Sequence, residues 1–338
     1  MTFEISTKNA ARKSGKNGDI MKKPYFRTAL ALFATVTAFL FVSCASMPKA
    51  TVEQKSRMFW TIEGTDKNGN PSKVHILGTI HVGDERLYPL PEEAMKAWAS
   101  STRLAGEIST EDIDNLQNEI TSLMIVSAAT AKGRKVTDFL TEEQKQAAIK
   151  CLGEPMVKQM EKFEPWVLNT MVSNFAYSDS GLSAEKGVDM YLMADARKNG
   201  RKWEGLDTLQ TQLDIIVFGD YDTQLTMLKD VLDDIAEPED VYDYINRLYN
   251  AYLAGSTKDV ALLETEEAEE SVEKAGFYEQ YYKQLIPERN KKWAKTIKQW
   301  LWEGGETFIF AGCAHFSGDQ SVFVYLKENG VTDEIISE

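Results

Sequence analysis

The sequence predicts an α+β fold in which a central mixed β-sheet is formed by N- and C-terminal strands around a large helical middle region. Strand-like apolar runs lie near both ends of the chain, whereas helix-start signals and amphipathic segments fill the middle. In addition, the runs V-H-I-L-G-T-I-H-V-G-D at 74–84 and F-I-F-A-G-C-A-H-F-S-G-D at 308–319 share a Gly-x-x-His motif at a strand end. With 338 residues, 43% of them hydrophobic, the chain can bury a sizeable core. We therefore expect one domain over 55–338.

The first third of the chain predicts a hairpin, a short helix and a further strand. The turn-rich segment D-K-N-G-N-P separates two runs of strand-forming residues. Pro91, followed by acidic residues, is typical of a helix start. The next apolar run ends on a carboxylate, Glu107. The expected bounds are 59–62 and 73–77 for the hairpin strands, 91–100 for the helix and 103–108 for the third strand.

The middle of the chain predicts helices. Thr141 and Gln144 have the spacing of a capping box, Pro165 suits a first helical position, and Asn199-Gly200 is typical of a helix end. The dense acidic run 264–273 is expected on a solvated helix face or loop, with metal or basic-peptide binding as a distant alternative. The remaining expected elements are helices at 184–198 and 205–217, at least three helices in 222–302, a helix at 320–329, and strands at 202–204, 307–311 and 333–336.

Residues 1–43 predict an export signal. A basic stretch begins at Met21, the expected true start, and the apolar run 29–42 is too short for a comfortable membrane span. It ends in Phe41-Val42-Ser43-Cys44, which resembles the bacterial signal for attaching a lipid to the cysteine. We expect a lipid-anchored membrane protein of the bacterial cell envelope, with 44–54 as the tether. An uncleaved anchor with an incidental Cys44 is the alternative.

Charge and cysteine content argue against two classes of protein. A net charge of -14 argues against a nucleic-acid partner, because phosphate contacts need clustered Lys and Arg. After removal of the signal, Cys151 and Cys313 remain, and one pair of cysteines does not make a disulfide framework. We expect neither nucleic-acid binding nor a structural disulfide.

Two of the three histidines occupy equivalent positions. His81 and His315 each close an apolar run, with Gly three residues before and Gly-Asp shortly after. We expect the preceding glycine to let the backbone turn sharply at the sheet edge, where ligands of such sheets gather. His75 lies within a strand and is expected to be a satisfied core histidine.

These strand ends suggest a metal site. Two neutral imidazoles with one or two carboxylates, from Glu107 and Asp207, would hold a divalent ion with an open position for water. Such an ion lowers the pKa of its water toward neutrality and so supplies a nucleophile.

Each candidate also has a structural alternative. Glu107 could cap a helix or pair with a surface Arg, and Asp207 could be the N-cap of its helix. Cys313 could be a buried apolar residue or, less favoured, a nucleophile. Arg289 could stabilise an oxyanion or simply lie on a helix.

An ordered set of motifs resembles the TraB/GumN family, which is related to the TIKI metalloproteases and more distantly to erythromycin esterase and ChaN-type haem-binding folds. The resemblance covers about 59–336. The motifs are L-G-T-I-H-V-G-D at 77–84, L-Y-P-L-P at 87–91, A-G-E-I at 105–108, G-V-D at 187–189, G-L-D-T-L-Q-T-Q-L at 205–213, E-R-N-K-K-W at 288–293 and F-A-G-C-A-H-F-S-G-D at 310–319.

The resemblance implies a divalent-metal-dependent hydrolase of peptides or proteins, with manganese or cobalt favoured over zinc. It implies His81, Glu107 and His315 as both metal ligands and catalytic groups. From the residues themselves we add Arg289 as a candidate catalytic group and Asp207 as a candidate ligand. The usual Gly-Leu-Glu-Thr of the family is Gly-Leu-Asp-Thr here, so the carboxylate arm of Asp207 is shorter. The rival expectation is a non-enzymatic lipoprotein that binds haem, a metal or a peptide in the same cleft.

Overall fold

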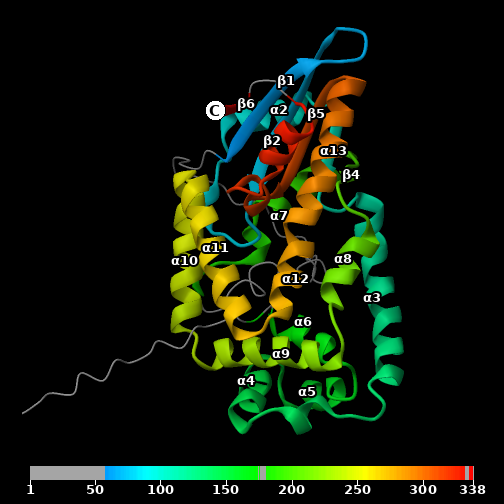
Figure 1. The fold of residues 1–338 in the computed structure, drawn as a ribbon, viewed down its shortest axis with the longest axis vertical. Coiled ribbons are helices and arrows are strands. Elements are labelled where there is room, and N and C mark those ends of the chain that lie inside the picture. The colour runs from blue at the N-terminus through cyan, green and yellow to red at the C-terminus, as the bar shows by residue number, and fades with distance from the viewer. Residues whose placement is uncertain (1–57, 174, 176–179, 332–334, 338) are drawn as a thin grey trace, which may run out of the picture.

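A computed structural model describes residues 58–173, 175, 180–331 and 335–337 of the chain (Figure 1). The expected signal segment, Cys44 and the tether at 44–54 lie outside the described residues. Within the described ranges, no helix combines the length and apolarity that a membrane span requires.

The expected α+β architecture is confirmed. In the described residues, six strands form one mixed sheet in the order β4-β3-β5-β2-β1-β6. Strands β2, β5, β3 and β4 run parallel to one another, whereas β1 pairs antiparallel with both β2 and β6. The sheet therefore joins the two ends of the chain, and it also takes one short strand from the helical middle. The strands are β1 Phe59–Thr65, β2 Pro71–Thr79, β3 Arg103–Gly106, β4 Glu204–Gly205, β5 Gly305–Gly312 and β6 Ile335–Ser337.

The β1–β2 hairpin is closed by the turn that the sequence predicted. The Asp66 carboxylate accepts hydrogen bonds from the backbone N–H groups of Asn68 and Asn70, both at 2.8 Å. Gly69 adopts a φ of 81°, a left-handed conformation that glycine allows without steric cost. These local interactions set the register that pairs Phe59 with Leu77.

Helices cover the sheet and extend beyond the carboxyl ends of its parallel strands (Figure 1). Trp98 of α2 packs edge-on against Phe308 and Phe310 of β5, with ring centroids 5.3 and 5.8 Å apart. The helices are α2 Glu92–Ser100, α3 Thr110–Thr130, α4 Glu142–Leu152, α5 Glu154–Met160, α6 Pro165–Ser173, α7 Val188–Lys198, α8 Leu209–Ile216, α9 Tyr221–Ala236, α10 Glu239–Ala254, α11 Thr257–Lys274, α12 Phe277–Leu285, α13 Pro287–Glu303 and α14 Val322–Glu328.

Most predicted helix starts are confirmed, and one predicted helix is interrupted. The capping box of Thr141 and Gln144 is present, and Pro165 is the first residue of α6. The helix expected over 184–198 is instead a 3-10 turn, Ala184–Lys186, followed by α7. Gly187 separates the two in an extended conformation, with φ −62° and ψ 148°.

The acidic run lies on α11, but part of it faces inward. Glu267 is only 2% exposed. The Glu264 carboxylate accepts a hydrogen bond of 3.0 Å from the hydroxyl of Tyr282. Burial raises the pKa of Glu264 to about 7. The expectation of a solvated face was therefore wrong for these two residues, because α11 is packed on both α10 and α12.

Candidate active site

The carboxyl ends of the parallel strands bring four predicted site residues to one edge of the sheet. His81 follows β2, Glu107 follows β3, Asp207 follows β4, and His315 lies in the 3-10 turn Cys313–Phe316 directly after β5. Because β2, β5, β3 and β4 are consecutive parallel neighbours in the sheet, these residues end on the same edge.

Gly312 lies where three of these side chains meet. A Cβ atom built on Gly312 would lie 3.3 Å from Oε1 of Glu107, 3.7 Å from Nε2 of His81 and 3.8 Å from Cδ2 of His315. The structure therefore brings both histidines and Glu107 together. Gly312 has an ordinary φ of −51°, so the close approach of the three side chains, rather than the expected sharp turn, explains why a glycine suits this position.

His81 is oriented by a carboxylate from α7. Its Nδ1 lies 3.0 Å from Oδ1 of Asp189, which leaves Nε2 facing Gly312. Burial lowers the pKa of His81, but Asp189 and then Glu107 raise it, and the net effect is a raised pKa. Gly187 makes this pairing possible, because a Cβ there would lie 2.5 Å from the backbone oxygen of His81.

His315 is oriented by an amide from α13. Its Nδ1 lies 2.6 Å from Oδ1 of Asn290, whose Nδ2 donates to the backbone oxygen of Gln320 at 2.7 Å. This second bond fixes which end of the amide faces the ring, so Nδ1 carries the proton and Nε2 keeps its lone pair. Nε2 is buried and has no hydrogen-bond partner among the described residues. Burial, reinforced by Arg289, holds the pKa of His315 well below its usual value, so the ring is neutral.

Glu107 belongs to a buried ion-pair network. Its Oε2 accepts from Nη2 of Arg289 at 2.5 Å, and its Oε1 accepts from the backbone N–H of Gly312 at 2.9 Å. Burial raises the pKa of Glu107, but Arg289, followed by both histidines, lowers it further, to about 2. The carboxylate is therefore ionised near neutral pH.

Asp207 anchors the other side of Arg289. Its carboxylate accepts from Nε of Arg289 at 2.7 Å, from Nε1 of Trp293 at 2.8 Å and from Nε2 of Gln212 at 3.0 Å. The suggested N-cap role for Asp207 was wrong, because the side chain of Thr208 caps α8 instead. Arg289 does not lie on the helix surface, since it is only 3% exposed.

The remaining candidates are structural in this fold. Nδ1 of His75 lies 2.9 Å from Oγ1 of Thr61 within the sheet, and Phe59 stacks on its ring. Cys313 is buried, and burial raises the pKa of its thiol to about 12. Such a thiol is a poor nucleophile near neutral pH. Cys151 and Cys313 are not joined by a disulfide.

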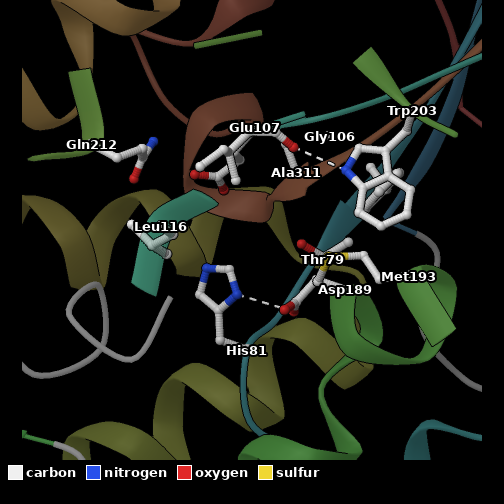
Figure 2. A pocket seen from close by; sticks show the side chains of 12 residues that line it. Thr79, His81, Gly106, Glu107, Leu116, Asp189, Met193, Trp203, Gln212 and Ala311 are labelled. Carbon is white, nitrogen blue, oxygen red and sulfur yellow. Dashed lines mark hydrogen bonds and ion pairs between the residues drawn. The ribbon is translucent and has the colours of Figure 1, made fainter. Parts of the chain in front are cut away.

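A small cavity of about 40 Å³ opens beside His81 and Glu107 (Figure 2). One part of its lining is polar and includes Asp189 and Gln212, whereas the other part is formed by apolar side chains such as Leu116. Figure 2 shows the imidazole of His81 and the carboxylate of Glu107 on either side of the central space. Arg289 and His315 are not part of this lining.

The histidines fit part of a metal site. Each Nδ1 faces an oxygen acceptor, the arrangement by which proteins orient a metal-binding imidazole, and the lone pair of Nε2 is left for a ligand. Across the described part of the chain, however, no three His, Cys, Asp or Glu side chains are grouped so that they could hold a metal ion. Both oxygens of Glu107 already accept N–H bonds, and Asp207 already has three donors. A third ligand would have to come from water or from a movement of Glu107.

The sequence did not identify the two residues that orient the imidazoles. Asp189 and Asn290 lie 108 and 25 positions from their histidines in the chain, and no local spacing connects them. Their only sequence signal was membership of the motifs G-V-D and E-R-N-K-K-W.

Comparisons with known proteins find a matching family and a distant relative. The model of the TraB/PrgY/gumN family matches residues 58–335. A protein of Treponema pallidum (strain Nichols), described only as uncharacterized, is 27% identical over an alignment of 311 residues that covers 89% of this chain and 91% of the relative. No solved structure gives a match.

Proposed function

Because this chain belongs to the TraB/PrgY/gumN family, we propose that it is a divalent-metal-dependent hydrolase that acts on peptides or proteins. One observation carries the proposal. Two imidazoles, each oriented through Nδ1 by an oxygen acceptor, meet an ionised carboxylate at Gly312, and at least one Nε2 is buried without a partner. Leaving such a nitrogen buried and unpaired is costly, and a bound ion would remove that cost.

In this proposal, His81 and His315 would hold the ion through their Nε2 atoms, and manganese or cobalt is favoured over zinc by the family resemblance. A divalent ion held there would provide a nucleophilic water near neutral pH and a positive charge to polarise the substrate carbonyl. Asp189 and Asn290 keep the two rings in the tautomer that presents Nε2.

Glu107 and Arg289 take different roles. A carboxylate whose pKa is about 2 is a weak base, so Glu107 is poorly suited to accepting a proton from the attacking water. It is better suited to binding the ion or to orienting that water. Arg289 donates to Glu107, to Asp207 and to the backbone oxygen of Leu285. We therefore assign Arg289 to positioning Glu107 rather than to binding an oxyanion.

Peptide hydrolysis with and without metal tests this function. The purified protein is incubated with a peptide library after chelation, and again after manganese, cobalt or zinc is restored. We expect chelation to abolish turnover and His315→Ala to lower it at least about 100-fold. His75→Gln is the matched control, since it removes the histidine that lies outside the site. Equal rates in chelator and in metal would contradict the proposal.

The size of the cavity limits which ligands the protein could bind there if it is a binding protein rather than an enzyme. A water molecule needs roughly 10–15 Å³ of such volume, so a cavity of about 40 Å³ holds a few waters and is far smaller than a haem. Stoichiometric metal binding with no turnover of any peptide would favour a metal-binding module over the hydrolase.

We also propose that the protein is an exported lipoprotein, anchored through a lipid on Cys44. The proposal is supported by the basic start at Met21, the apolar run 29–42 and the order Phe-Val-Ser-Cys that follows. Mass spectrometry of the membrane fraction should show a mature chain that begins at a lipid-modified Cys44. A Cys44→Ser variant should lose the modification, and an unmodified Cys44 in the wild type would refute the anchor.

A further inference from the structure

We propose that the cavity beside Glu107 is a specificity subsite that receives one small branched side chain of the substrate, such as that of Val or Thr. This inference rests on the proposed function. It specifies the type of substrate residue that the protein accepts next to the cleaved bond.

One side of the cavity is a rigid apolar surface built from separate elements. Leu116 of α3, Met193 of α7 and Trp203 before β4 contribute to it, and they are 2%, 7% and 3% exposed. The indole Nε1 of Trp203 donates to the backbone oxygen of Ile108 at 2.9 Å, which fixes the ring (Figure 2). Burial of an aliphatic group against this surface is favourable.

A polar atom on the lining points to a ligand. Thr79 is 1% exposed, and its Oγ1 has no hydrogen-bond partner among the described residues. Thr79 lines the same cavity and lies between His81 and Trp203 in Figure 2. A buried hydroxyl of this kind is normally satisfied by water or by a ligand. A substrate Thr could supply that hydrogen bond, and with Val a retained water could do so.

The size of the cavity limits the side chain. At roughly 10–15 Å³ for each water, the volume of about 40 Å³ accommodates about three waters, or about 90 Å³ of liquid. An isopropyl or hydroxyethyl group fills such a space, whereas a benzyl or a four-carbon amine exceeds it. Gly106 also lines the cavity, and a Cβ there would lie 3.0 Å from the Phe310 ring, so a side chain at 106 would crowd the lining.

The cavity is placed beside the reacting groups. His81 and Glu107 belong both to its lining and to the cluster around Gly312. A side chain in the cavity would therefore put the adjoining carbonyl near that cluster, which is how a subsite turns side-chain fit into cleavage preference.

Peptides that differ at one position test the inference. The set carries Ala, Val, Thr, Leu, Phe or Lys next to the cleaved bond, and kcat/KM is measured with metal present. We expect the wild type to favour Val and Thr over Phe and Lys at least about 10-fold, the discrimination that pocket fit commonly provides. Met193→Ala should enlarge the cavity and move the preference toward Leu and Phe by a similar factor.

Matched variants separate cavity shape from general damage. Met190→Ala truncates a methionine of the same helix that is outside the cavity lining, and it should keep the wild-type order. Leu116→Ala is a second enlarging variant if Met193→Ala does not fold. Thr79→Val should selectively reduce cleavage after Thr. A wild-type order that both enlarging variants retain would overturn the subsite while leaving the hydrolase standing.

A separate measurement tests the subsite if the protein proves not to be a hydrolase. If no peptide is cleaved with any metal, the proposed function is wrong, and the cavity is then tested by NMR titration with N-acetyl-valinamide. Binding that Leu116→Trp abolishes and Met190→Ala preserves would support the subsite. Absence of binding to the wild type would overturn it.

Discussion

Gly78 and Cys313, one from each Gly-x-x-His motif, are in direct contact. A Cβ atom built on Gly78 would lie 3.1 Å from the Cβ and 3.2 Å from the Cα of Cys313. The two motifs therefore pack against each other through the residues that precede their histidines. A side chain at position 78 would displace the short turn that carries His315.

Gly78→Ala should lower both stability and turnover, since the added methyl overpacks this contact at a typical cost of about 1–3 kcal/mol. Cys313→Ala should leave turnover within a few-fold of wild type, because it keeps Cβ and removes only a thiol whose pKa burial raises to about 12. Urea unfolding and peptide turnover measure the two effects. Loss of all turnover in Cys313→Ala would instead indicate a thiol mechanism.

The residues that orient the histidines should control metal affinity. Asp189→Asn and Asn290→Ala should each weaken binding about 10–100-fold, because partners of ligating imidazoles typically contribute that much. Isothermal titration with manganese or cobalt measures the change. Asp195→Asn is the matched control, since Asp195 is also on α7 but accepts its hydrogen bond from Trp98. Equal effects of the two α7 variants would argue against the assignment of Asp189.

Substitutions should distinguish the structural role of Asp207 from the role of Glu107 in turnover. Asp207→Asn removes the anchor of a buried guanidinium, so it should cost about 3–5 kcal/mol of stability while the folded protein keeps its metal stoichiometry. Glu107→Gln should also lower stability, but in addition it should reduce turnover by about 10²-fold or more. Measuring the metal content of the folded fraction of each variant tests this distinction. Loss of bound metal in Asp207→Asn would restore Asp207 as a ligand.

Acid should destabilise the protein through Glu107. Its pKa falls from the usual 4.5 to about 2 on folding, so its stabilising contribution is complete above pH 4.5 and is lost between 4.5 and 2. At about 1.4 kcal/mol per pH unit, the contribution is about 3 kcal/mol. Glu107→Gln should flatten the dependence of unfolding free energy on pH in that window. An unchanged slope would show that Glu107 is not ion-paired in solution.

Metal affinity should rise with pH. Because the pKa of His81 is raised, a proton competes with a metal ion for Nε2 of His81. Metal binding should therefore release that proton. Titrations in buffers of different ionisation enthalpy should detect this proton release, and affinity should level off above the raised pKa. Turnover should fall on the acid side for the same reason. Affinity that is independent of pH would exclude His81 as a ligand.

Much of the fold was predictable from local patterns. The apolar runs around Val74 and Phe308 identified the central strands, and the equivalence of His81 and His315 implied that both strands end at the same edge. This inference needed no knowledge of the middle of the chain, because neighbouring parallel strands place their carboxyl ends together. Glu107 followed from the same rule.

What local patterns could not predict depends on contacts between distant segments. The pairing of His81 with Asp189 requires α7 to begin directly after Gly187. A glycine is needed at that break because the backbone of His81, about a hundred residues earlier in the chain, lies against it. The three donors of Asp207 come from two helices that no spacing connects. For Asp207, its position before a predicted helix indicated an N-cap, but in the fold its carboxylate anchors the buried guanidinium of Arg289.

The position of β5 makes the order of synthesis matter. This strand lies between β3 and β2, and its backbone pairs with residues more than 200 positions earlier. Until residues 305–312 are present, a growing chain can pair β1 with β2 and β3 with β4 only as two separate half-sheets with open edges, and it lacks His315 altogether. Such long-range strand insertion is slow relative to local helix formation. A growing polypeptide therefore has no complete set of site residues, and the same step that closes the sheet also assembles the site.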